Sequence, residues 1–151
     1  MAQPEQVRAI AANSFLIEFD SGGMVSPRIH KVTGLSRKTG TLDLVDGGTN
    51  RKLSFSDGIT EYGDVTFIRA RDGSADDAAF TAFFDAVSTS GEKKSGQLIQ
   101  FHFGVEVLRI TFKGLLCHEQ SFNDFATESS DKSEITVQAK VDFWEPSYTA
   151  L

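Results

Sequence analysis

Apolar and polar residues alternate along most of this chain, the pattern of strands that bury one face and expose the other. The clearest alternation puts five apolar residues on one face: Ile135, Val137, Ala139, Val141 and Phe143. Similar alternations predict strands at about 15–20, 25–35, 65–70, 98–103, 105–112 and 113–122. Gly104, between two of these segments, is typical of a hairpin turn or a bulge. The pattern predicts about eight strands in total.

One segment, from about Ala75 to Ser88, has the periodicity of a helix instead. Its large apolar residues fall three and four positions apart and form a single stripe: Phe80, Phe83, Phe84 and Val87. Ser74 is a favourable N-cap, and Asp77 stands where a capping box would let its carboxylate reach back to the cap. The stripe predicts packing into the core or into a subunit interface rather than a cofactor site.

Many strands and one helix predict a mainly β fold, a barrel or sandwich of about eight strands with the helix packed against one side. A chain of 151 residues is long enough to bury a core without a metal or a disulfide. We therefore expect one domain over residues 1–151, beginning with a loose arm at 1–13.

Residues 36–62 do not fit a compact strand or a simple loop. They contain the turn pairs Asp46-Gly47 and Asp57-Gly58. They also contain short apolar alternations: Leu42 and Leu44, then Leu53 and Phe55. The segment is too apolar for a disordered linker, and it predicts an extended hairpin. Because an isolated two-stranded hairpin is marginal in water, a neighbouring subunit is expected to cover these side chains. The alternative is a hairpin folded back on its own domain.

The net charge of −6 disfavours a nucleic-acid partner, which would need a basic surface. Residues 1–52 hold seven Lys and Arg against five Asp and Glu, whereas residues 53–151 hold eight against sixteen. This is either a randomly uneven surface or a pair of opposite-sign surfaces that meet when copies stack. On the second interpretation, four basic residues of the hairpin meet the acidic part of another copy: Arg37, Lys38, Arg51 and Lys52.

The residues that usually carry chemistry do not form a recognisable site. Cys117 is the single cysteine, so no internal disulfide is possible, and its apolar neighbours predict a buried thiol. His30, His102 and His118 have no zinc-ligand spacing. The glycines of 91–96 lack the lysine and hydroxyl residue of a phosphate loop. We expect no catalytic residue, no metal and no cofactor.

No apolar core of a signal peptide begins the chain, and no run approaches the roughly 18 apolar residues of a membrane helix. We expect synthesis in the cytosol and no membrane segment. Export as part of a larger particle stays open.

Four motifs occur in a distinctive order. Phe15 to Asp20 is followed by Val32-Thr33-Gly34-Leu35, then by the hairpin with its Gly47-Gly48 pair, then by the strand Tyr62 to Arg69 and one helix. In this order they resemble the tail tube protein family of contractile phage tails, tailocins and extracellular contractile injection systems. More distantly, they resemble the haemolysin-coregulated tube protein of type VI secretion.

The resemblance implies a structural subunit of an inner tube. Hexameric rings stack into a hollow conduit, and a contracting sheath drives it through a target envelope. It implies self-assembly, with sheath, baseplate and terminator proteins as partners and possible cargo in the lumen. It also implies assembly in the cytoplasm, followed by residence in a virion or a phage tail-like particle. In tube relatives the matching hairpin bridges to the next ring, so Leu42, Leu44, Arg51, Lys52, Leu53 and Phe55 are the candidate ring-stacking residues.

Two other classes remain open on the residues alone. One is a monomeric or dimeric β-barrel module that binds a small ligand. The other is an enzyme whose site cannot be recognised in a single sequence.

Overall fold

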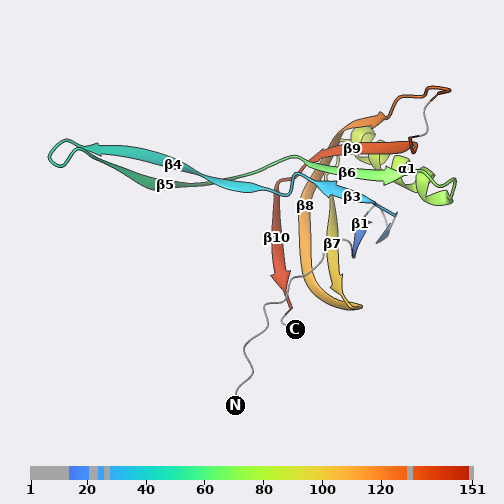
Figure 1. Ribbon diagram of the computed structural model, residues 1–151, viewed down its shortest axis with the longest axis horizontal. Coiled ribbons are helices and arrows are strands. Elements are labelled where there is room, and N and C mark those ends of the chain that lie inside the picture. Colours follow the sequence, from blue (N-terminus) through green and yellow to red (C-terminus); the bar gives the residue numbers. More distant parts are fainter. Residues whose placement is uncertain (1–13, 21–23, 26–27, 129–130, 150–151) are drawn as a thin grey trace, which may run out of the picture.

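The computed structural model describes residues 14–20, 24–25, 28–128 and 131–149, so the predicted arm at 1–13 lies outside the described residues. Ten strands and one helix form in this part of the chain (Figure 1). Eight of the strands join one sheet, and the other two form a separate hairpin. The prediction of a mainly β fold of about eight strands with one flanking helix is confirmed.

The eight-stranded sheet is antiparallel and bends about one long strand, β8 (Val105–Phe122). Its path runs β2-β1-β7-β8-β9-β6-β3, and β10 also pairs with β8. The other bounds are β1 Phe15–Asp20, β2 Met24–Val25, β3 Lys31–Thr33, β6 Val65–Ala70, β7 Lys94–His102, β9 Glu134–Lys140 and β10 Phe143–Tyr148. The first part of β8 pairs with β7 and β10, and its end pairs with β9. The sheet therefore makes two layers that share β8.

A glycine allows β8 to pass from one layer to the other without a break. Gly114 has a φ of +71°, and a Cβ at this position would lie 2.1 Å from the carboxylate of Asp142. Only glycine tolerates both the left-handed backbone and this close approach. The two strands predicted at 105–112 and 113–122 are for this reason one continuous strand, which corrects the prediction.

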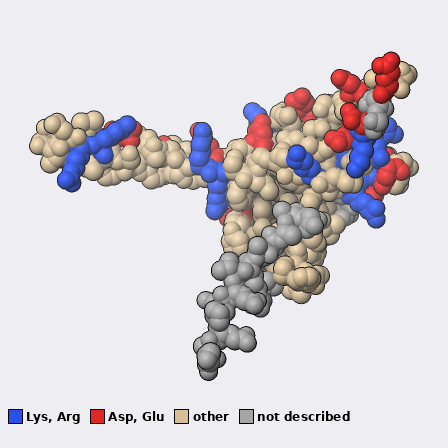
Figure 2. Space-filling model, in the orientation of Figure 1, with Lys and Arg blue, Asp and Glu red and all other residues tan. Residues whose placement is uncertain are grey.

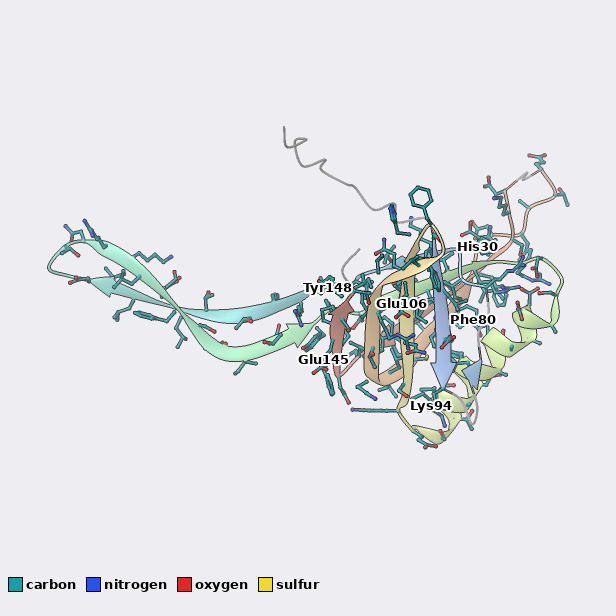
Figure 3. All side chains as sticks on the ribbon, turned by 90° about the horizontal axis from the view of Figure 1, so that it is seen from below. His30, Phe80, Lys94, Glu106, Glu145 and Tyr148 are labelled. Atoms are coloured by element: carbon teal, nitrogen blue, oxygen red, sulfur yellow. The ribbon has the colours of Figure 1, made fainter. Side chains whose placement is uncertain are left out.

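Phenylalanine side chains fill the space between the two layers. The ring of Phe19 on β1 meets that of Phe67 on β6 edge-on at 5.2 Å, and Phe67 meets Phe112 of β8 at 6.1 Å. The helix α1 (Ala75–Ser90) covers this core, and its Phe83 stacks on Phe19 at 4.2 Å. Phe80, which Figure 3 labels, is fully buried in the same cluster. Side chains from both layers and from the helix therefore form one hydrophobic core.

The helix begins at its predicted cap but without the predicted capping box. The hydroxyl of Ser74 accepts a hydrogen bond from the Asp76 amide, whereas the Ser74 amide donates to Asp72 at 2.9 Å. Asp77 accepts instead from the Gly73 amide at 3.2 Å and from the Arg69 guanidinium at 2.8 Å. The carboxylate of Asp77, which the sequence predicted to bind the helix cap, therefore binds the buried Arg69 instead.

Two strand predictions fail where the chain changes layers. The predicted strand at 25–35 is two short strands, because β2 pairs with β1 in one layer and β3 pairs with β6 in the other. The strand expected from the alternation of Ile135 to Phe143 ends at Lys140, although Val141 is still buried, since the chain turns there before β10 begins at Phe143. Phe143 is 41% exposed, and Trp144 takes the buried position instead.

The remaining two strands form the predicted hairpin, β4 (Arg37–Asp46) and β5 (Arg51–Tyr62), which projects far from the body (Figure 1). The turn falls at 47–50, after Asp46 as predicted. Asp57-Gly58 is not a turn but a bulge in β5 opposite Gly40, where a Cβ would lie 2.0 Å from the Asp57 carboxylate.

Candidate assembly surfaces

One face of the hairpin is mainly apolar and the other is mainly polar, with the exposed Val45 as an exception on the polar face. Its register sets Leu42 opposite Phe55 and Leu44 opposite Leu53, so these four side chains share a face. Between 44% and 60% of each is exposed, and Figure 3 shows the side chains of the hairpin standing clear of the body. On the other face Asp43 accepts from the Ser54 hydroxyl at 2.8 Å. In the described part of the subunit, this apolar face is about half exposed.

The four basic residues of the hairpin differ in their surroundings. Lys52 lies 3.1 Å from Asp43, and Lys38 lies 4.0 Å from Glu61, both on the exposed hairpin. The guanidinium of Arg37 lies over the ring of Trp144, 4.9 Å from its centroid. Arg51 alternates with Leu53 and therefore belongs to the apolar face, near the tip. Figure 2 shows Lys and Arg side chains along the hairpin in blue.

The root of the hairpin is held tightly by the body. The ring of Tyr62 meets that of Trp144 edge-on at 5.7 Å. The Gly63 amide donates to the Ser36 carbonyl at 3.0 Å, and a Cβ on Gly63 would lie 2.7 Å from the Ser36 hydroxyl. Gly34 has a φ of +83°, and a Cβ there would lie 2.0 Å from a backbone oxygen. These contacts fix the direction in which the hairpin leaves the domain.

A row of polar pairs crosses β1, β7 and β8 at the surface of the sheet. Arg109 donates to Glu106 at 2.7 Å and to the side-chain oxygen of Gln97 at 2.8 Å. The Gln97 amide donates in turn to Glu18. The Arg109 hydrogen bond lowers the pKa of Glu106 below its usual value. The row gives this face of the sheet a charged and polar character.

A fully buried cation joins β6 to the start of the helix. The Arg69 guanidinium donates to Asp77 and to Asp72, both at 2.8 Å, to the Ser74 hydroxyl at 3.1 Å and to the Arg28 carbonyl at 2.7 Å. Hydrogen bonds from the hydroxyl and amide of Ser74, helped by the Arg69 charge, lower the pKa of Asp72 to about 2. The cluster fixes the N-terminus of α1 on the sheet.

The predicted helix stripe faces the core. Phe80, Phe83 and Val87 are at most 2% exposed, and Phe84 is half-buried against the same cluster. Sequence reasoning did not select two exposed aromatic residues, Phe122 at the end of β8 and Phe125 in the loop after it, which are 49% and 75% exposed. Their apolar character was the available signal, and it was missed because they border a polar loop.

The histidines and the cysteine do not converge. The Nδ1 atom of His30 accepts from the Ala70 amide at 3.1 Å, and His118 lies 3.3 Å from Asp64. His102 packs against Phe103. Burial raises the pKa of the Cys117 thiol to about 12, so it carries almost no thiolate at neutral pH. Within the described ranges, no three His, Cys, Asp or Glu side chains are grouped as metal ligands.

The described part of the chain contains no helix with the length and apolar content needed to cross a membrane.

A packed β domain whose prominent surface feature is an uncovered apolar hairpin defines a protein that acts by assembly. The chain belongs to the family of the T4-like virus tail tube protein gp19, which matches residues 11–140. It is therefore a tail tube protein by family, as the order of motifs indicated.

Solved structures of tail-like particles share the fold. A chain of the anti-feeding prophage baseplate, 6-fold symmetrised, is 17% identical with a TM-score of 0.80, and all of both chains is covered. A chain of the sheath–tube complex of an extracellular contractile injection system, PVC, is 14% identical with a TM-score of 0.75, covering 93% of each chain. Hcp1 from Flavobacterium johnsoniae is 13% identical with a TM-score of 0.51, covering 89% of this chain and 96% of that one. Comparison with curated proteins gives no match.

Proposed function

We propose that this chain acts as a single structural unit of the inner tube of a contractile injection machine. Six copies form a ring, rings stack into a hollow conduit, and contraction of a surrounding sheath drives the conduit through a target envelope. The subunit performs no catalysis; it acts by rigidity and self-assembly. The single observation that carries this proposal is the projecting hairpin with its uncovered apolar face, in a chain of the tail tube family.

The partners follow from the same proposal. Besides other copies of itself, the subunit contacts a sheath protein along the tube, a baseplate at one end and a terminator at the other. The similar chains from a sheath–tube complex and from a baseplate support such contacts. The tube assembles in the cytoplasm and then remains in a phage tail-like particle or a virion, which can be released from the cell with any cargo in its lumen.

The hairpin is the contact between successive rings. Each of Leu42, Leu44, Leu53 and Phe55 is about half exposed, and covering one such side chain contributes roughly 1 kcal/mol. The four side chains of one hairpin bind weakly. A ring of six subunits binds strongly, because its six hairpin contacts form together. Arg51 and Lys52 contribute register more than affinity, since exposed ion pairs are worth little.

Shortening the hairpin tests this contact. Replacing residues 43–56 by an Asn-Gly turn is expected to leave folded subunits or separate rings, and no long tubes in negative-stain images. Long tubes of normal length from this variant would refute the stacking role of the hairpin.

A matched pair of charge substitutions tests the apolar face alone. Leu44→Glu with Leu53→Lys places opposite charges at one cross-strand pair, which keeps the hairpin but removes apolar surface. Thr41→Glu with Ser56→Lys makes the same change at a cross-strand pair of the polar face. The first variant is expected to lose tubes and the second to keep them. Equal tube formation by both variants would contradict the proposal.

A further inference from the structure

A shallow groove of about 510 Å³ lies between α1 and the paired ends of β8 and β9. Its lining is mostly small and apolar, with two acidic residues and one arginine: Ala78, Thr81, Ala82, Phe122, Ile135, Asp77, Asp85 and Arg71. The Gln120 amide donates to the Thr81 hydroxyl at 3.2 Å and joins the strand to the helix beneath it. The groove is therefore a preformed feature of the packing between helix and sheet.

Exposed aromatic surface continues from the groove into the loop that follows β8. The ring of Phe122 lies 6.4 Å from that of Phe125, with 49% and 75% of these residues exposed. Phe125 also lines a second hollow of about 330 Å³, together with Asp124 and Asp131. Contiguous exposed apolar surface of this kind, with charged residues at its edge, is typical of a site that another protein covers.

The groove and the hairpin lie at opposite ends of the subunit. Figure 1 places the tip of the hairpin at one end of the longest axis, and α1 with the loop after β8 at the other end. A projection at one end and a receiving surface at the other allow a head-to-tail contact between copies. Such a heterologous contact does not close on itself along this axis, and it repeats into an open rod.

The two surfaces are also complementary in chemistry. The hairpin offers Leu42, Leu44, Leu53 and Phe55 on one face, with Arg51 beside them at the tip. Asp46, which shares this face, already accepts from the Gly48 amide and the Thr49 hydroxyl, so its carboxylate is engaged in the turn. The groove offers apolar surface with the exposed Asp85 at its rim. Figure 2 shows both acidic and basic side chains at that end of the molecule, and Arg71, which also lines the groove, lies 3.7 Å from Asp77.

We propose that the groove between α1 and the β8–β9 end receives the hairpin of a second copy of this chain in the next ring. The inference rests on the proposed function and names the surface on which the hairpin docks. The apolar face of the hairpin covers Ala78, Ala82 and Phe122, and Arg51 faces Asp85. The occupant is another copy rather than a foreign peptide, because the chain itself carries the complementary surface.

Two alanines of the helix provide a matched test. Ala82 lines the groove, whereas Ala86, one turn further along, is exposed but outside it. Ala82→Arg is expected to reduce tube length in negative-stain images at least tenfold, and Ala86→Arg to leave it unchanged. Circular dichroism of both variants verifies that the subunits fold. Tubes of normal length from folded Ala82→Arg would overturn the proposal.

A charge exchange identifies the contact directly. Arg51→Asp and Asp85→Arg, each alone, are expected to shorten the tubes several-fold, and the two together to restore most of the length. A double variant no better than either single one would also overturn the proposal. The experiments separate the docking hypothesis from the proposed tube function. If Leu44→Glu with Leu53→Lys abolishes tubes while Ala82→Arg does not, the hairpin still stacks rings but docks on another surface.

Discussion

Removing one carboxylate from the buried Arg69 cluster is expected to destabilise the whole domain. Arg69 is fully buried, and its guanidinium donates to Asp77 and Asp72, which are 14% and 42% exposed. Asp77→Ala would leave a buried cation with Asp72 as its remaining carboxylate partner. Breaking a buried ion pair costs about 3–5 kcal/mol, and the remaining partner reduces this to about 2–4 kcal/mol here.

The free energy of unfolding of Asp77→Ala and of Asp76→Ala is measured by urea titration, with circular dichroism as the probe. Asp76 stands in the same first turn of the helix, so its removal also loses the favourable interaction with the helix dipole, about 0.3–1 kcal/mol. The difference between the two variants isolates the contribution of the buried cluster. If the free energies of unfolding of Asp77→Ala and Asp76→Ala differ by less than about 0.5 kcal/mol, the cluster does not anchor the helix and the reasoning is wrong.

Three further predictions concern the core and the titratable groups. Phe83→Ala should lower the free energy of unfolding by about 3–5 kcal/mol, because it opens a cavity beneath Phe19, whereas Phe84→Ala should cost less, as this side chain is only half-buried. The folded-state pKa of Asp72 is depressed, so its stabilising contribution is present above pH 3.8 and is lost as the pH falls towards about 2. Acid titrations of stability should therefore show a smaller loss over that range in Asp72→Asn than in the parent chain, and equal losses would contradict the assignment. Cys117 should react with a thiol reagent at neutral pH only as the protein unfolds, because the thiol is 2% exposed with a pKa of about 12; rapid labelling of folded protein would contradict its burial.

Local periodicity was sufficient to predict most of the elements of this fold. The helix stripe and the strand alternations arise from residues three, four or two positions apart, which one segment specifies by itself. The segment at 25–35 and the end at Phe143 failed for a different reason. At both places the chain passes from one layer of the sheet to the other, and tertiary pairing determines where a strand ends.

Of the two candidate assembly surfaces, the sequence predicted the hairpin but not the groove. The hairpin could be predicted because its turn at Asp46-Gly47 and its apolar pairs lie close together along the chain. The groove could not, because Phe122, Ile135 and Ala82 come together only after β8 pairs with β9 and the helix packs beside them. Arg69 shares the buried face of β6 with Val65 and Phe67, but its acidic partners meet it only after the helix packs on the sheet.

The one-sided projection of the hairpin has a consequence for how a tube of this protein begins and ends. If every ring offers hairpins in one direction, the last ring at one end carries apolar hairpins with nothing to cover them. The ring at the other end carries surfaces that no hairpin fills. The two ends of the rod are then chemically different, and no single protein fits both. On the proposed stacking, growth would be directional, and stopping it at a defined length would require a terminator specific to the end that still grows.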